Sequence, residues 1–207
     1  CASPPLPADR VESQALTDTA QTRLGQAVAP RLAQHHPGLS GFMPFEDPHD
    51  AFAARVLLSR LADRSLDVQY FIWHGDAVGT LLWQAMWQAA ERGVRVRLLV
   101  DDANNAGLDP MLAALDAHPH IELRLYNPFV NRGSRAIGYL TDFSRLNRRM
   151  HNKSFTADNQ VSVVGGRNIA DEYFGAAEGL GFADLDVMTI GAMVQEVSRE
   201  FDLYWNS

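Results

Sequence analysis

The chain has 207 residues, of which 46% are hydrophobic and 21% are charged, and its formal net charge is -7. This composition is typical of a folded globular domain rather than a disordered chain, and no run approaches the roughly 20 uncharged apolar residues that a membrane-spanning helix needs. The acidic balance argues against general nucleic-acid binding, which depends on basic charge, so no nucleic-acid partner is expected.

Residues 1–45 are expected to form an N-terminal tether and peripheral segment, because proline, alanine and polar residues dominate there. Cys1 is the only cysteine, which excludes an intrachain disulfide. A cysteine at position 1 followed by a polar, proline-rich stretch is typical of mature bacterial lipoproteins. We therefore expect lipidation at Cys1 and a membrane-associated location in a bacterial cell envelope. The alternative is that the sequence begins at this residue arbitrarily.

From residue 46 onward, helices and strands are predicted to alternate. Asp47-Pro48 supplies a helix N-cap followed by proline at the first helical position, and Asp109-Pro110 opens a later helix. A helix between them is predicted to end at Gly93. Strands are predicted where apolar residues alternate or run together, at residues 66–72, 94–100 and 121–125. This succession indicates parallel pairing in a layered α/β domain.

The last third of the chain has a different pattern. Strands are predicted at residues 149–156, 160–165 and 184–190, with a turn at 157–159. A closing helix is predicted to bury Val194, Val197, Phe201 and Tyr204. The fold class expected for residues 46–207 is therefore α/β, a layered α/β/α domain with a mixed, largely parallel central sheet.

The segment His151-Asn152-Lys153 carries the strongest chemical signal. On a strand, residues i and i+2 point to the same face, so His151 and Lys153 are predicted to project together. An imidazole can attack phosphorus while a nearby ammonium stabilises the charge that grows on the phosphoryl oxygens. Lys153 is the only lysine in a chain with 18 lysines and arginines, which argues against a chance pairing.

Further residues are predicted to bind the same phosphate. The strand after His151 ends in Gly165-Gly166, where the lack of side chains lets the backbone approach an anion closely. Asn168 can add an amide donor. Arginines beside these two segments are also predicted to bind substrate: Arg148, Arg149 and Arg167.

The pattern His-x-Lys-x4-Asp, which ends at Asp158 and is followed by Gly165-Gly166-Arg167-Asn168, resembles the signature of the phospholipase D superfamily. The longer string from Arg148 to Lys153, with Asp171-Glu172-Tyr173-Phe174, resembles the first catalytic half of bacterial cardiolipin synthases, most closely those of the C type. The likeness covers roughly residues 45–207.

The resemblance implies a phosphatidyltransferase that works on phospholipid phosphodiesters through a phosphohistidine intermediate, without a cofactor or a metal. It implies that His151 is the nucleophile or its acid/base partner, and that Lys153 and Asn168 hold the phosphate. It also implies a carboxylate that orients the histidine through Nδ1. Asp186 fits that role best and Asp184 is the fallback, whereas Asp158 is interpreted as structural.

Two departures from the family pattern matter. Gly166 stands where many members have serine, and the chain has one His-x-Lys motif where the family needs two per active site. A C-terminal half or a second copy must complete the site. We expect the missing half, because the sequence stops after Tyr204-Trp205, where a first lobe would end. The expected partners are therefore that half, the membrane surface, an anionic phospholipid (phosphatidylglycerol) and a second phospholipid.

Several alternatives stay open. Asp101 and Asp102 could hold Mg²⁺, although a polar turn that caps the next helix is favoured. Residues 127–151, rich in arginine and aromatics, are either a loop that rests on anionic headgroups or a solvated surface loop. The alternative functions are a homodimeric phosphodiesterase or nuclease with the same histidine chemistry, and a non-catalytic half-module that binds lipid.

Overall fold

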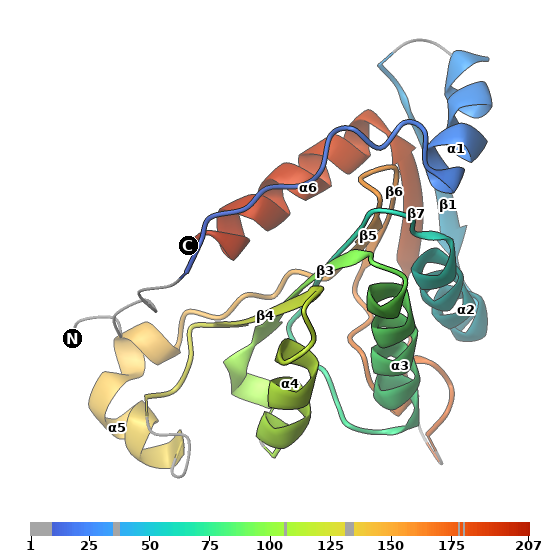
Figure 1. Ribbon diagram of the computed structural model, residues 1–207. Coiled ribbons are helices and arrows are strands. Elements are labelled where there is room, and N and C mark those ends of the chain that lie inside the picture. The colour runs from blue at the N-terminus through green and yellow to red at the C-terminus, as the bar shows by residue number, and fades with distance from the viewer. Residues whose placement is uncertain (1–9, 35–37, 106, 131–134, 178, 180) are drawn as a thin grey trace.

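The computed structural model describes residues 10–34, 38–105, 107–130, 135–177, 179 and 181–207, so Cys1 lies outside the described residues. Within them, helices cover both faces of one sheet (Figure 1). The strands are β1 (Ser40–Phe45), β2 (Ser65–Tyr70), β3 (Arg95–Asp101), β4 (Ile121–Tyr126), β5 (Ser154–Ala157), β6 (Val161–Gly165) and β7 (Asp186–Gly191). The helices are α1 (Arg23–Ala33), α2 (Pro48–Leu61), α3 (Ala77–Glu91), α4 (Asp109–Asp116), α5 (Arg135–Leu146) and α6 (Ala192–Trp205), with short 3-10 turns η1 (Asp102–Asn104) and η2 (Asp171–Tyr173).

The strand order in the sheet is β1-β7-β6-β5-β2-β3-β4. Strand β3 pairs in parallel with β2 and β4, whereas the pairs β2–β5, β5–β6, β6–β7 and β7–β1 are antiparallel. The predicted mixed sheet is confirmed, but the expectation that it is largely parallel is wrong. The reason is local: a short turn at residues 158–160 joins β5 to β6, and a parallel pair would need a much longer crossover.

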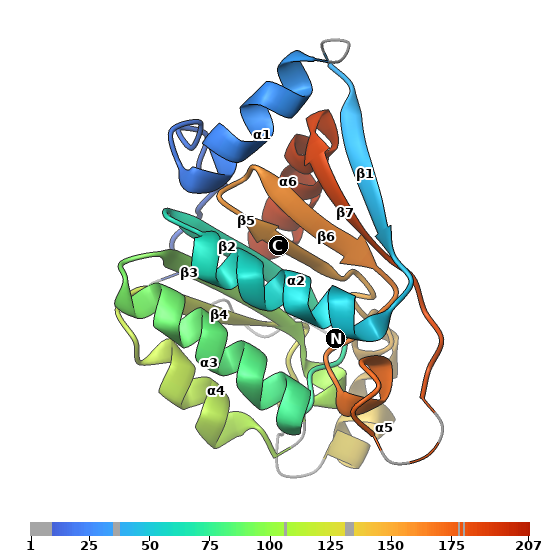
Figure 2. The same ribbon diagram turned by 90° about the vertical axis from the view of Figure 1, so that its right-hand side faces the viewer.

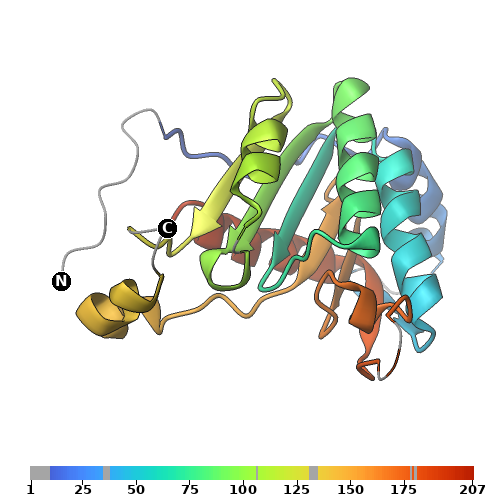
Figure 3. The ribbon, with the colours of Figure 1, turned by 90° about the horizontal axis from the view of Figure 1, so that it is seen from below.

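The predicted layers are confirmed. Figure 3 shows α2, α3 and α4 on one face of the sheet and α6 on the other. The core on the first face is apolar and includes Val68, Phe155 and Val163. The face toward α6 is more polar, because the Arg97 guanidinium is buried there beside the Asp67 carboxylate, with 2.6 Å between Nε and Oδ1.

Helix α6 buries a stripe that departs from the predicted one. The prediction names Val197 and Tyr204, but the buried positions are Val194, Ser198, Phe201 and Trp205. The Trp205 ring stacks on Phe201 with 5.6 Å between centroids and contacts the Arg97 guanidinium at 5.4 Å. The contact with the buried Arg97 on β3 therefore explains why Trp205 is buried where the sequence predicts Tyr204.

The described part of residues 1–45 is packed onto the domain and is not a free tether. Strand β1, which is not predicted from the sequence, pairs with β7 along its whole length. The backbone N–H groups of Ser13 and Ala15 donate to the side chains of Asn206 and Asp202. The segment that begins at residue 10 accordingly runs beside α6 in Figure 1.

The ends of four neighbouring strands lie level with one another at one end of the sheet, called its edge below, and they position the predicted site. Strands β2 and β6 end there, whereas β5 and β7 begin there, and the pairs Gln69–Ser154, Ser154–Val164 and Gly165–Asp186 keep these ends level. Figure 2 shows these four strands side by side. The chain segments just beyond the strand ends therefore gather at this edge, and they carry the predicted catalytic residues.

Candidate active site

His151 and Lys153 lie next to each other directly before β5. The Nζ atom of Lys153 is 3.2 Å from Nδ1 of His151 and donates a hydrogen bond to the His151 carbonyl oxygen at 2.7 Å. The His151 side chain is exposed, whereas Lys153 is buried. The strand begins at Ser154 and not at the predicted residue 149, yet the segment before it still brings the two side chains together.

Phe71, the first residue after β2, lies beside this pair. Its ring centroid is 4.8 Å from that of His151 and 5.6 Å from Nζ of Lys153. Burial lowers the pKa of Lys153, and the Asp184 carboxylate opposes this change by favouring the charged ammonium. The aromatic ring and the carboxylate thus both stabilise a cation next to the imidazole.

The last residue of β6, Gly165, and the next residue, Gly166, leave room for carboxylates of the opposite segment. A Cβ atom on Gly166 would collide with the Asp184 carboxylate, and one on Gly165 would collide with that of Asp186. Asp184 and Asp186 thus occupy the space that a side chain would fill at these positions, and close approach of a phosphate to the glycine backbone stays a prediction. The same collision gives a physical reason for glycine, rather than serine, at position 166.

Asp186 has arginine partners and not the predicted histidine contact. Its buried carboxylate accepts a hydrogen bond from Arg55 at 2.8 Å and lies 3.6 Å from the guanidinium of Arg167. Arg55 also donates to the Tyr70 hydroxyl at 2.8 Å. A buried carboxylate needs a cation or hydrogen-bond donors as partners, and α2 supplies Arg55 for Asp186. Asp184, the fallback, raises the pKa of Lys153 through its negative charge, which opposes the effect of burial.

Arg167 and Asn168 hold the loop after β6 in place. Arg167 is buried and donates to the carbonyl oxygens of Phe45 and Glu46 at 3.2 Å each, so its predicted role in substrate binding is replaced by a structural one. Asn168 accepts from the Ile72 N–H at 3.1 Å through Oδ1 and donates to the Tyr173 hydroxyl at 3.0 Å through Nδ2. The amide nitrogen carries two hydrogens, so Asn168 retains a donor for a phosphate.

Asp158 lies at the far end of β5 and has a structural role, in agreement with its interpretation from the sequence. Its carboxylate accepts hydrogen bonds from the backbone N–H groups of Asp63, Arg64 and Ser65, with the shortest contacts at 2.9, 2.7 and 2.9 Å respectively. The side chain is fully buried, and its backbone has a φ of 52° in the left-handed region. Asp158 thus fixes the β5–β6 turn to the start of β2.

Asp101 anchors the segment that leads into His151. Its carboxylate accepts from Arg149 at 3.0 Å, from the Met150 N–H at 2.9 Å and from the Ala103 N–H at 2.8 Å. Burial raises the pKa of Asp101, and these hydrogen bonds counteract the rise. The favoured interpretation of a polar turn therefore describes this residue better than a magnesium site. Arg149, predicted to bind substrate, is instead tied to Asp101, while Arg148 is exposed.

The predicted basic and aromatic loop contains helix α5, which is kinked at Asp142. Two of its apolar side chains face outward, because Leu140 is 87% exposed and Phe143 is 60% exposed. Arg145 is not a solvated cation, since it pairs with Asp142 in the same helix. The side chains of Arg132 and Arg135 lie outside the described residues.

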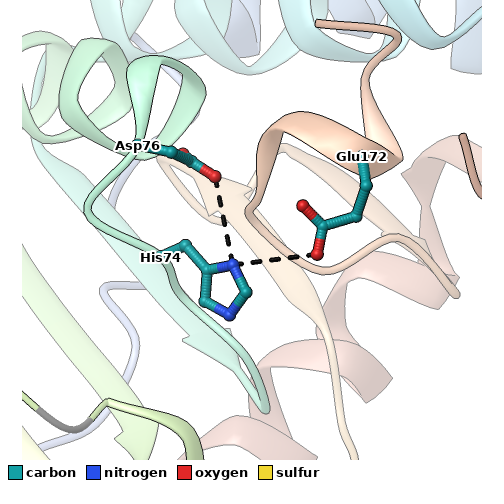
Figure 4. Close-up of side chains that lie close together, drawn as sticks. All are labelled: His74, Asp76 and Glu172. Atoms are coloured by element: carbon teal, nitrogen blue, oxygen red, sulfur yellow. Dashed lines mark ion pairs between the residues drawn. The ribbon is translucent and has the colours of Figure 1, made fainter. Parts of the chain in front are cut away.

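A second cluster of ionisable side chains was not predicted from the sequence (Figure 4). The Nδ1 atom of His74 lies 3.7 Å from Glu172 Oε1 and 4.0 Å from Asp76 Oδ2. His74 lies in the loop between β2 and α3, two residues before Asp76, which is the N-cap of α3, whereas Glu172 comes from η2. The spacing of His74 and Asp76 alone gives no reason to join them to Glu172, which is about 100 residues further along the chain.

An apolar groove of about 1160 Å³ lies between α1 and α2, against β1 and β7, and is lined by Leu24, Phe42, Leu57, Met188 and neighbouring apolar residues. His151 and Lys153 are not part of it. Across the described ranges, every helix is too short or too polar to pass through a bilayer.

Comparison with known proteins agrees with this geometry. The family described as cardiolipin synthase, PLD-like domain, matches residues 58–205. Cardiolipin synthase C from Escherichia coli is 58% identical over 183 residues, which cover 88% of this chain and 38% of that protein. An uncharacterized protein from Helicobacter pylori is 36% identical over 193 residues, with coverage of 91% and 38%. The chain thus spans well under half the length of these relatives.

Solved structures share the fold at low sequence identity. NucT from Helicobacter pylori aligns with a TM-score of 0.61 and 14% identity, over 82% of this chain and 98% of that one. The alignment thus spans almost the whole of the NucT chain.

Proposed function

This chain belongs to the phospholipase D-like domain family of cardiolipin synthases, and from that membership we propose that it is the first catalytic half of a phosphatidyltransferase. The observation that carries the proposal is the 3.2 Å approach of Lys153 Nζ to His151 Nδ1 at an exposed sheet edge. The 58% identity to a cardiolipin synthase over 88% of the chain supports phospholipid substrates, namely phosphatidylglycerol and a second phospholipid.

The proposed reaction has two displacement steps. A histidine nitrogen attacks the phosphorus of a phosphodiester, and the bond to the first alcohol breaks as that oxygen takes a proton from a general acid. A second alcohol then gives its proton to the same group and attacks the phosphohistidine, which breaks the P–N bond. Lys153 and Asn168 stabilise the charge on the non-bridging oxygens. No metal or cofactor takes part.

His151 can serve as the nucleophile or as the acid/base group, and its neighbours decide which. When the Lys153 ammonium donates to Nδ1, the ring proton of a neutral imidazole sits on Nε2, which then has no lone pair with which to attack phosphorus or accept a proton. When Nδ1 instead donates to a carboxylate, the Nε2 lone pair is free to attack. We assign that carboxylate to Asp184, because Asp186 is already paired with Arg55.

A second histidine must come from outside this chain, since it contains one His-x-Lys motif. We propose that a C-terminal half supplies it, in line with the greater length of the relatives, of which the chain covers 38%. The alternative is a homodimeric phosphodiesterase or nuclease. It is favoured by the match to NucT, whose chain is covered to 98% by this single lobe.

The membrane is proposed as a partner through two features. Lipidation of Cys1 would anchor the protein in the cell envelope. Helix α5 presents Leu140 and Phe143 outward, and the exposed Arg148 lies between this helix and His151. Apolar side chains next to an arginine suit insertion among anionic headgroups beside the site.

Lipid turnover tests the proposal. The protein extended by its C-terminal half would be incubated with phosphatidylglycerol vesicles in EDTA, and lipid products would be measured by mass spectrometry beside a His151→Ala control. Metal-free formation of cardiolipin that His151→Ala abolishes is expected. The homodimeric alternative replaces the proposal if the extended protein is inactive and the 207-residue chain, without the C-terminal half, is active as a dimer. A protein that binds vesicles but turns over nothing would support a non-catalytic half-module.

A further inference from the structure

We infer that His74, Asp76 and Glu172 form a binding site for a first-row divalent metal ion, separate from the His151 chemistry. Each residue offers one ligand atom, and the three atoms all lie within 4.8 Å of one another. Figure 4 shows the imidazole of His74 between the two carboxylates, with Nδ1 directed at both. A nitrogen and two carboxylate oxygens are the donor set that Zn²⁺ and Mn²⁺ accept.

The spacing fits ligands of one ion better than direct hydrogen bonds. The Nδ1 atom of His74 is 3.7 Å from Glu172 and 4.0 Å from Asp76, which is longer than a normal hydrogen bond. Ligand atoms that sit at about 2.0–2.2 Å from a tetrahedral zinc are roughly 3.3 Å apart. Small rotations of the His74 and Glu172 side chains would close the observed gaps around an ion, while backbone N–H groups hold Asp76 in place.

Charge balance also points to a cation. Asp76 and Glu172 place two carboxylates close together, and within the described ranges their ion-pair contacts are to His74. Several other carboxylates are paired with arginines, as Asp186 is with Arg55 and Asp101 is with Arg149. Two neighbouring carboxylates repel each other unless a positive charge lies between them. A protonated His74 supplies one such charge, and a divalent ion supplies more.

The backbone holds the ligands in place without an ion. The N–H of His74 donates to the Ile169 carbonyl oxygen at 2.8 Å, which fixes the loop between β2 and α3 to the loop before η2. Asp76 accepts from the Gly79 N–H at 3.0 Å and from the Asp171 N–H at 2.8 Å. These contacts fix both carboxylate-bearing segments, so little ordering cost would oppose binding.

The site remains open to solvent, which leaves coordination positions for water. The His74 side chain is 45% exposed, and those of Asp76 and Glu172 are 22% and 28% exposed. Such an open site binds an ion less tightly than a closed four-ligand one. The cluster lies at the same end of the sheet as His151. Asn168 and Ile169, just before η2, contact Ile72 and Trp73, and these two residues directly follow Phe71. Phe71 in turn lies against His151. A bound ion would add positive charge where an anionic ligand approaches.

Calorimetric titration of the EDTA-treated, dialysed chain with MnCl₂, and then with ZnCl₂, tests the inference. Saturable binding of one ion per chain is expected, with a rise in Tm that grows with the ion concentration. His74→Ala and Glu172→Gln should each weaken binding at least tenfold. Asp76 is not changed, because it also caps α3. His49→Ala, at an exposed histidine outside the cluster, is the matched control and should bind as the parent does.

Two outcomes would overturn the inference. One is the absence of saturable binding of either ion by the parent protein at millimolar concentration. The other is unchanged affinity in both His74→Ala and Glu172→Gln, which would place the ion elsewhere. Circular dichroism and the Tm without metal would show whether the variants are folded. Electron paramagnetic resonance of bound Mn²⁺ gives a second readout that is independent of lipid turnover.

Discussion

The ammonium nitrogen of Lys153 lies 3.2 Å from Nδ1 of His151. This contact leaves Nε2 on the far side of an exposed ring, where a phosphodiester can reach it. The same lysine is buried next to the Phe71 ring and is influenced by Asp184. One side chain thus orients the histidine and supplies a positive charge for the phosphate.

Replacement of Lys153 by methionine should reduce turnover by about 10²–10³-fold, because a charged donor to the phosphoryl oxygens is lost. Methionine has a similar length and suits the buried stem, so the fold should persist. Steady-state kinetics beside circular dichroism would check both statements. Retention of most of the activity in a folded Lys153→Met protein would argue against its role at the phosphate.

Burial lowers the pKa of Lys153 below the ordinary value of 10.5, so its charge should be lost at a lower pH than that of an exposed lysine. The unfolded chain keeps this proton to higher pH than the folded chain. The stability of the parent relative to Lys153→Met should therefore rise as the pH increases from the folded pKa toward 10.5. Activity should fall over the same interval as the ammonium disappears. Denaturant titrations and a pH–rate profile test both, and an alkaline limb at or above 10.5 contradicts the account.

Asp184 and Asp186 should respond oppositely to substitution by asparagine. Asp186→Asn leaves Arg55 without its buried partner and should lower the free energy of unfolding by about 3–5 kcal/mol. Asp184→Asn should change stability little but lower turnover, because Asp184 acts beside Lys153. Urea unfolding and kinetics on both variants provide the comparison. An Asp186→Asn protein that is stable but inactive would indicate that Asp186, and not Asp184, orients His151.

Asp158→Ala should destabilise the fold without a direct effect on chemistry. The carboxylate satisfies the N–H groups of Asp63, Arg64 and Ser65, so its removal should cost about 3 kcal/mol. The measurement is the midpoint of urea unfolding together with kcat well below that midpoint. A near-normal stability would mean that water replaces these contacts readily.

Leu140→Ser combined with Phe143→Ser should weaken binding to phosphatidylglycerol vesicles at least tenfold, because both side chains are proposed to enter the headgroup region. Stability should hardly change, since these residues are 87% and 60% exposed. Leu203→Ser removes an apolar side chain that is 66% exposed on α6 and serves as the control. Equal vesicle binding by all three proteins would remove α5 from the membrane contact.

Local patterns were sufficient for much of the fold and for the His151–Lys153 pair. The i, i+2 rule holds even though β5 begins only at Ser154. The antiparallel part of the sheet was underestimated, since β1 is short, carries Pro44 and was assigned to the peripheral segment. Its pairing with β7 joins residues about 150 positions apart, which no local pattern reveals.

Side-chain partners were the least predictable part of the site. Asp184 and Asp186 share a face of the predicted strand, so the sequence does not show which of them would orient His151. The structure pairs Asp186 with Arg55, which is 131 residues away in the sequence, and this leaves Asp184 for the role. Likewise, Gly165 and Gly166 are required by carboxylates of a distant segment. The cluster of His74, Asp76 and Glu172 depends on the pairing of Ile169 with Trp73 in the loop after β2.

The most direct test of the central claim is turnover of phosphatidylglycerol in EDTA by the protein with its C-terminal half, compared with the same protein carrying His151→Ala. The account predicts metal-free product formation that falls by at least about a hundredfold in the variant, whichever of its two roles His151 takes. A folded His151→Ala protein that turns over lipid at the parental rate would contradict it.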